Sequence, residues 1–143
     1  MASDATRLPI ESVSPMSIIL HIVRHQEWDA AISSGYYKPV SLKSDGFIHC
    51  STIGQTADTA NRFFPNQQGL ALICIDTNLI EFEIRYEGPA CDGDQRTESL
   101  FPHLYGPLNI SAVVHVVDFV PGADGTFVLP KEIDRFRKKK GTV

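Results

Sequence analysis

The run Leu70-Ala71-Leu72-Ile73-Cys74-Ile75-Asp76 sets the fold of this chain, because it is apolar at every position but the last. A short continuous apolar run of this kind predicts a buried strand. Residues 18–23 (IILHIV) and residues 112–120 have the same character, and Pro121-Gly122 ends the second of them. The sequence therefore predicts three buried strands, spread over most of the chain.

Two segments between these runs have the spacing of helices. In residues 25–34, Trp28, Ala31 and Ile32 fall on one helical face, and Gly35 is suited to end the helix in a left-handed conformation. The second segment has its apolar residues at helical spacing, namely Ile53, Ala57, Ala60 and Phe64. Thr52 and Gln55 form a capping box before it, and Pro65 ends it.

Residues 79–87 alternate between apolar and polar side chains, which predicts a strand with one buried face. Arg85 and Glu87 share its polar face. Residues 46–50 predict a further short strand, and residues 88–98 a polar loop. Two helices in the first half, followed by several strands in succession, predict an α+β fold with a mixed, mostly antiparallel sheet.

At 143 residues the chain fits one domain. We expect a disordered extension at residues 1–16, a single α+β domain at 17–130 and a basic tail at 131–143. The extension lacks the continuous apolar stretch of a secretory signal. No apolar run is long enough to predict a membrane span.

The charge and cysteine content exclude several classes of protein. The net charge of −4 and the isoelectric point of about 5.7 give no basic surface for nucleic acid. The three cysteines form no CxxC pair, which indicates a reducing, cytoplasmic setting and no zinc site. Neither standard glycine-rich nucleotide loop is present.

Two short segments carry most of the candidate chemistry. They are residues 45–52 (DGFIHCST) and residues 100–108 (LFPHLYGPL), and each places a histidine in an apolar run with a hydroxyl two residues later. The hydroxyls belong to Ser51 and Tyr105. Residues two apart share a strand face, so each pair is able to present two hydrogen-bonding groups to one ligand.

Each candidate also has an ordinary structural explanation. His21 lies among aliphatic residues of its strand, where a core histidine bonded to a backbone carbonyl is the alternative to a cleft residue. Ser51 precedes a helix whose free N–H groups favour an anion, or it is a simple turn residue. Arg85 is able to hold a phosphate or carboxylate, or it is solvated surface. Glu98 is a candidate acid or base.

The order of these motifs resembles the domain-of-unknown-function 952 family over roughly residues 18–120. The residues that carry the resemblance are HIV (21–23), Trp28, Gly35-Tyr36, Ser41-Leu42, DGFIHCS (45–51), Gln55, ANRFF (60–64), Ile75-Asp76, Arg85-Tyr86-Glu87 and FPHLYGPL (101–108). The family typically has Trp where this chain has Tyr86. The resemblance implies the fold of ADP-ribosyltransferases.

A shorter similarity links His49-Cys50-Ser51, the following helix and residues 70–76 to RNA 2'-phosphotransferases, which use NAD. This similarity implies that His21 contacts the ribose of NAD. It does not place the catalytic glutamate of ADP-ribosyltransferases, for which Glu87 and Glu98 are the candidates.

The sequence thus predicts a cleft that binds NAD or a related nucleotide and transfers or cleaves ADP-ribose. The expected catalytic residues are His49, His103 and Glu98, and the expected ligand-binding residues are His21, Ser51, Arg85 and Tyr105. NAD is the expected cofactor, and no metal is predicted. The alternatives are a non-catalytic module for a small anionic metabolite and a metal site formed by His21, His49 and His103.

Overall fold

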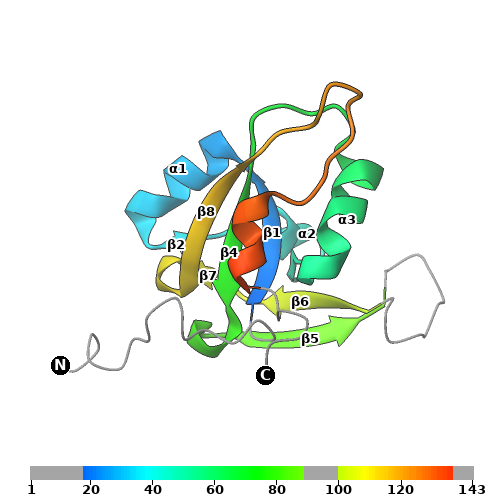
Figure 1. Cartoon of the computed structure of the whole chain (residues 1–143). Coiled ribbons are helices and arrows are strands. Elements are labelled where there is room, and N and C mark those ends of the chain that lie inside the picture. Colours follow the sequence, from blue (N-terminus) through cyan, green and yellow to red (C-terminus); the bar gives the residue numbers. More distant parts are fainter. Residues whose placement is uncertain (1–17, 89–99, 137–143) are drawn as a thin grey trace.

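The strand β4 (Leu70–Asp76) lies at the centre of the fold in the computed structural model, which describes residues 18–88 and 100–136 (Figure 1). It pairs antiparallel with β1 (Ile18–Arg24) on one side and with β8 (Val113–Phe119) on the other. All seven residues of β4 are buried. The prediction of three buried strands from the apolar runs is confirmed for the central one and for most of β1, whereas β8 is only partly buried.

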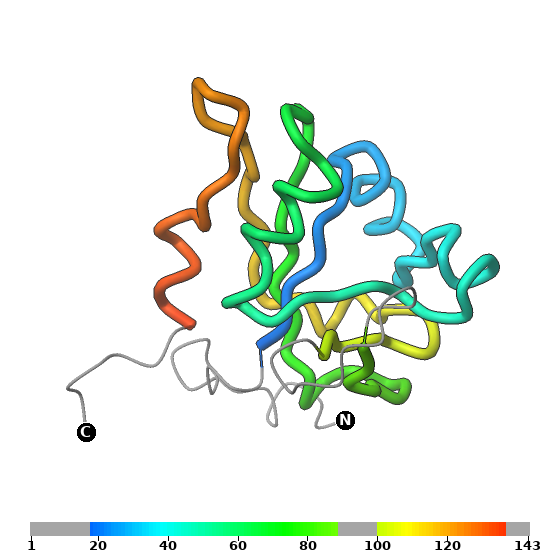
Figure 2. Tube along the Cα trace, turned by 90° about the vertical axis from the view of Figure 1, so that its right-hand side faces the viewer, coloured from blue at the N-terminus to red at the C-terminus, as the bar shows by residue number. Residues whose placement is uncertain are grey.

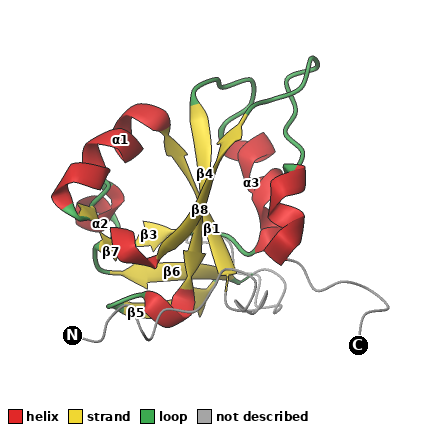
Figure 3. Ribbon diagram, turned by 60° about the vertical axis from the view of Figure 1, so that its left-hand side comes forward, coloured by secondary structure: helices red, strands yellow, loops and turns green. Residues whose placement is uncertain are grey.

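Each face of this sheet is covered by its own apolar core, which explains why β4 is apolar at successive positions. Figure 3 shows α1 and α2 on one side of the central strands and α3 on the other. The first core includes Ile19, Val23, Trp28, Tyr37, Ile48, Ala71, Ile73, Ile75, Leu104 and Leu108. The second includes Ile18, Leu20, Ala60, Leu70, Leu72, Cys74, Phe119, Phe127, Ile133 and Phe136.

The first helix, α1 (His25–Ser34), begins and ends where the sequence predicts. Gly35 ends it with a φ of 85°, and the N–H of Gly35 donates to the carbonyl of Ala31. Glycine adopts this left-handed conformation without a steric cost. Trp28 and Ala31 are buried as expected, but Ile32 is 51% exposed, so the buried stripe of α1 is narrower than the spacing predicts.

The second helix forms in two parts, a 3-10 turn η4 (Ile53–Gln55) and the helix α3 (Thr56–Phe63). The capping box is confirmed, since Thr52 and Gln55 bond each other's backbone in both directions. Ala60 is fully buried and Ile53 and Phe64 pack against the second core. The predicted apolar face is therefore the face that α3 presents to the sheet.

A second three-stranded antiparallel sheet carries the two histidine segments. It has the order β3-β6-β5, formed by β3 (Ile48–His49), β6 (Phe101–Tyr105) and β5 (Glu83–Glu87). Figure 1 shows β5 and β6 below the central strands in that view. An antiparallel bridge between Leu20 of β1 and Ser51 connects the two sheets.

Short elements complete the described part of the chain. β2 (Tyr36–Tyr37) pairs with β7 (Leu108–Asn109), and the short helix α2 (Ser41–Ser44) follows β2. The 3-10 turns η5 (Thr77–Leu79) and η7 (Ile110–Ala112) precede β5 and β8. The α+β class with antiparallel sheets and two main helices is confirmed.

The described part of the predicted basic tail is folded. Residues 131–136 form the 3-10 helix η8 (Lys131–Phe136), in which Ile133 and Phe136 are buried against the second core. In Figure 2 this segment, coloured orange to red, turns back beside the central strands. The folded region thus extends beyond residue 130 because two apolar side chains in the basic stretch complete the core. No helix in the described ranges is long and apolar enough to span a membrane.

Candidate functional site

The register of the β3-β6-β5 sheet separates an apolar row of residues from a polar one. Leu104 lies opposite Ile48 on one side and Ile84 on the other, and this row packs into the first core. The adjacent row of the sheet consists of His49, His103 and Arg85. Because successive side chains of a strand point to opposite faces, this second row lies on the face away from that core.

We call this surface the histidine face and define it by six residues. These are Phe47, His49, Arg85, Glu87, His103 and Tyr105. Four of the seven residues named in the sequence analysis as catalytic or ligand-binding are thus brought together: His49, His103, Arg85 and Tyr105.

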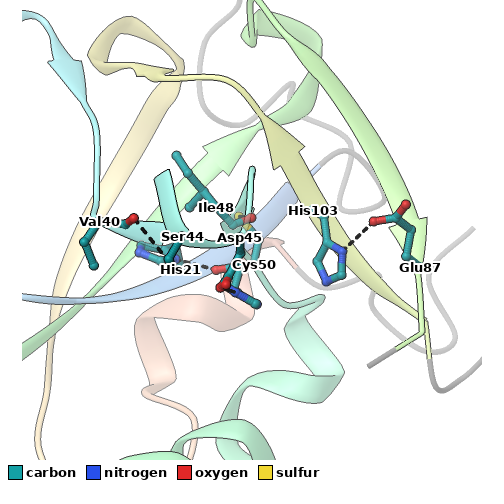
Figure 4. A network of polar contacts seen from close by, with 9 residues as sticks. His21, Val40, Ser44, Asp45, Ile48, Cys50, Glu87 and His103 are labelled. Atoms are coloured by element: carbon teal, nitrogen blue, oxygen red, sulfur yellow. Dashed lines mark hydrogen bonds and ion pairs between the residues drawn. The ribbon is translucent and has the colours of Figure 1, made fainter. Parts of the chain in front are cut away.

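Glu87 is the carboxylate of the histidine face. Its Oε1 accepts a hydrogen bond of 2.7 Å from Nδ1 of His103 and one of 2.6 Å from the hydroxyl of Tyr105. Figure 4 shows the contact between Glu87 and His103, which come from adjacent strands. His103 is 5% exposed, whereas the Glu87 side chain is 37% exposed. The carboxylate is therefore held by two hydrogen bonds within the protein and is still partly open to solvent.

These contacts set the charge of the site. The hydrogen bond from Tyr105, and then that from His103, lower the pKa of Glu87, so this carboxylate is ionised at neutral pH. The same bond to Glu87 raises the pKa of Tyr105, which stays protonated. Arg85 stacks over the Tyr105 ring, with 4.2 Å between its Cζ and the ring centroid, and also bonds Glu83.

His49 is held by a different carboxylate. Its Nε2 lies 2.7 Å from Oδ2 of Asp45, and the His49 side chain is 54% exposed. The bond from His49 lowers the pKa of Asp45. The rings of His49 and His103 lie with their centroids 5.6 Å apart, and Phe47 contacts both, stacking on His103 at 4.0 Å.

The carboxylate contacts determine which nitrogen of each histidine carries hydrogen. An ionised carboxylate only accepts, so Nδ1 of His103 and Nε2 of His49 are the N–H groups. In the neutral rings the lone pairs are then on Nε2 of His103 and Nδ1 of His49. Neither of these two atoms bonds a residue within 18–88 or 100–136. The face therefore presents two histidines, each oriented by a carboxylate.

His21 does not join the histidine face. Its Nδ1 lies 2.6 Å from the carbonyl oxygen of His49, and its Nε2 lies 2.9 Å from the hydroxyl of Tyr37. A carbonyl only accepts, so Nδ1 donates and Nε2 accepts from Tyr37. Burial lowers the pKa of His21 to about 4, which keeps this ring neutral. This is the arrangement of a core histidine, the structural explanation given for the residue above.

The same contacts argue against two other roles for these histidines, as metal ligands and as partners of a cysteine thiolate. With both ring nitrogens bonded, His21 has no lone pair left for a metal, so the three-histidine metal site is not formed. In the described ranges, no group of three or more His, Cys, Asp or Glu is arranged to hold a metal ion. Cys50 is buried in the first core, and burial raises its pKa to about 12, so it is not a thiolate partner for His49.

Ser51 is 5% exposed and lies at the bridge between the two sheets. After it, the N–H of Thr52 donates to the side chain of Gln55, and the N–H of Gln55 donates to the side chain of Thr52. Two of the N–H groups expected to attract an anion are therefore already bonded. In the described part of the chain no contact joins Ser51 to the histidine face. Glu98 lies outside the described residues.

Phe47 and Glu87 of the histidine face, and Asp45 beside it, were not among the seven residues expected from the sequence to be catalytic or ligand-binding. Asp45 and Phe47 are both within the DGFIHCS segment, and Glu87 was one of two candidate glutamates. The signal for Glu87 was its shared strand face with Arg85, but only the pairing of β5 with β6 places it beside His103 and Tyr105. The residues of either strand alone do not show which residues of the two strands lie opposite each other.

Replacing Tyr105 tests how the Glu87 carboxylate is held. We expect Tyr105→Phe to raise the pKa of Glu87, because the largest contribution to its lowered value is the Tyr105 hydroxyl bond. Carboxyl ¹³C chemical shifts followed through a pH titration measure it. An unchanged titration of Glu87 would show that the Tyr105 hydroxyl does not bond this carboxylate in solution.

Two solved structures of one bacterial protein are similar to this chain. The chain is similar to the crystal structure of protein CC0527 from Caulobacter crescentus, with a TM-score of 0.70 and 32% identity over 81% of this chain and 97% of that one. The solution structure of CC0527 matches with a TM-score of 0.64 and 33% identity over 78% of this chain and 91% of that one. No curated protein matches.

The sequence pattern of one family covers the segments that build the site. The family described as "Protein of unknown function (DUF952)" matches residues 22–116, a range that contains β3, β5 and β6 and therefore every residue of the histidine face. The motif-based resemblance found in the sequence is confirmed by this match and by the similarity to CC0527. The chain belongs to the DUF952 family.

Proposed function

We propose that the histidine face binds NAD or a related nucleotide and transfers or cleaves its ADP-ribose, on a fold akin to that of ADP-ribosyltransferases. The observation that carries the proposal is the ionised Glu87 carboxylate, fixed by His103 and Tyr105 and open to solvent. Breaking the bond between nicotinamide and ribose passes through a state with positive charge on the sugar. A preorganised carboxylate is the group that stabilises such a charge.

The surroundings of Glu87 suit the other parts of this ligand. Phe47 and Tyr105 provide aromatic surface for a flat ring, with 5.2 Å between their own ring centroids. Glu87 therefore takes the role of the acidic residue that the sequence alone left undecided between two positions.

Charge favours this proposal over a module for a small anionic metabolite. The histidine face and the carboxylates bonded to its residues carry one guanidinium, that of Arg85, and three carboxylates, those of Asp45, Glu83 and Glu87. With neutral histidines this set of four charged groups is net negative, which opposes a simple anion and favours the positively charged nicotinamide ring of oxidised NAD. The N–H groups after Ser51, which the anion-binding alternative requires, are partly bonded within the protein.

Binding and turnover are measured separately. We expect titration calorimetry to detect NAD binding, and release of nicotinamide from NAD to be detectable by chromatography. Glu87→Gln keeps the shape of the side chain and removes its charge. We expect this variant to bind NAD within about threefold of the original affinity and to release nicotinamide at least about tenfold more slowly.

The matched control is His25→Ala, which removes a histidine that pairs with Asp118 at 3.0 Å outside the histidine face. We expect it to leave both measurements unchanged. Binding of NAD without nicotinamide release would reduce the proposal to a binding module. Absence of NAD binding by the original protein would refute it.

A further inference from the structure

His49 is anchored at both its ring and its backbone, unlike an incidental surface histidine. Asp45 holds Nε2 of the ring at 2.7 Å, and His21 donates to the backbone carbonyl at 2.6 Å. His21 is itself fixed by Tyr37, and the bridge from Ser51 to Leu20 fixes the chain two residues beyond His49. The position and the tautomer of this ring are therefore both determined by the protein.

The ring nitrogen of His49 that takes no part in these contacts is Nδ1, which carries the lone pair of the neutral ring. It bonds none of the residues that the structure describes, and the side chain is 54% exposed. A neutral imidazole nitrogen that is oriented by a carboxylate and open to solvent is suited to accept a proton. His103 differs, because it is 5% exposed and its Nδ1 serves to hold Glu87.

We propose, building on the function proposed above, that His49 is the general base for the second substrate and that this substrate is an oxygen nucleophile, either water or a hydroxyl group. The two histidines then have different roles. His49 receives a proton through Nδ1, and His103 positions Glu87. His103 links the two groups, because its ring centroid lies 5.6 Å from that of His49 and its Nδ1 bonds Glu87.

The step balances without a further reactant. The oxygen of the acceptor forms a bond to the ribose carbon as the bond from that carbon to the nicotinamide nitrogen breaks. The electron pair of the broken bond stays on nicotinamide and neutralises its charge. The proton of the acceptor moves to Nδ1 of His49, and Asp45 stabilises the charged ring at Nε2.

His49→Ala tests the role by turnover and by chemical rescue. We expect this variant to release nicotinamide from NAD about 100-fold more slowly, with NAD affinity changed less than about threefold. Added imidazole restores part of the rate, because it replaces the missing base in the space that the variant opens. Loss of structure alone would not respond to imidazole, and His25→Ala shows neither the loss nor the rescue.

The tautomer of His49 in the ligand-free protein gives an independent measurement. Ring ¹⁵N chemical shifts at neutral pH should show hydrogen on Nε2, and hydrogen on Nδ1 would overturn the assignment. So would a normal rate in His49→Ala, or a slow rate that imidazole does not raise. If the original protein binds NAD but releases no nicotinamide, the role of His49 is overturned while the binding proposal stands. If NAD does not bind, both fail.

Discussion

The stability of this protein should fall by about 2 kcal/mol between pH 7 and pH 5 through the titration of His21 alone. Burial lowers the pKa of this ring from 6.5 to about 4 in the folded chain. Well above pH 6.5 His21 is neutral in both states and contributes no pH dependence. As the pH falls below 6.5, His21 binds a proton in the unfolded chain but stays neutral in the folded chain. Folding therefore becomes less favourable. The loss reaches about 3 kcal/mol near pH 4 and then levels off.

His21→Gln isolates this effect, because glutamine cannot titrate but keeps groups that bond the His49 carbonyl and the Tyr37 hydroxyl. Urea unfolding of the original protein and the variant at pH 7 and pH 5 gives two differences in free energy. We expect the original protein to lose about 2 kcal/mol more than the variant over this interval. Ile32→Ala, which changes an exposed side chain that does not titrate, should keep the pH dependence of the original protein's unfolding free energy. If His21→Gln and the original protein lose the same free energy of unfolding between pH 7 and pH 5, then His21 is protonated in the folded state at pH 5.

Local features of the fold could be predicted because short-range physics determines them. The helix at residues 25–34 needed only its apolar spacing and Gly35, and the capping box needed only Thr52 and Gln55. The apolar run at residues 70–76 was sufficient to predict the buried strand β4. Its position as the central strand depends on pairing with residues about fifty positions before it and forty after it, which no local pattern contains.

The placement of several candidate residues on one face could be predicted for the same reason. His49, His103, Arg85 and Tyr105 do share one face, because strand alternation assigns each of them a side and the register brings the sides together. His21 shows the limit of this reasoning. Its strand position leaves open whether a ring nitrogen reaches a ligand or a carbonyl, and the carbonyl of His49 comes from a strand 28 residues later. The apolar face predicted for residues 79–87 is also only partly buried, since Phe82, just before the edge strand β5, and Tyr86, within it, are exposed.

Leu104 is the residue on which the geometry of the histidine face depends most. It is fully buried between Ile48 and Ile84, directly behind the row of His49, His103 and Arg85. We expect Leu104→Ala to lower the free energy of unfolding by about 3 kcal/mol, because the lost side chain leaves a cavity in the first core. Chemical denaturation at pH 7 measures this change.

Two further variants show whether the loss comes from packing at this position. Leu104→Met keeps most of the volume and should cost less than about 1.5 kcal/mol. Ile32→Ala removes an exposed aliphatic side chain and should change stability by no more than about 0.5 kcal/mol. If Leu104→Ala costs as little as Ile32→Ala, then Leu104 does not face the core. Because the strand alternates, His103 and Tyr105 would then point inward, and the histidine face could not form.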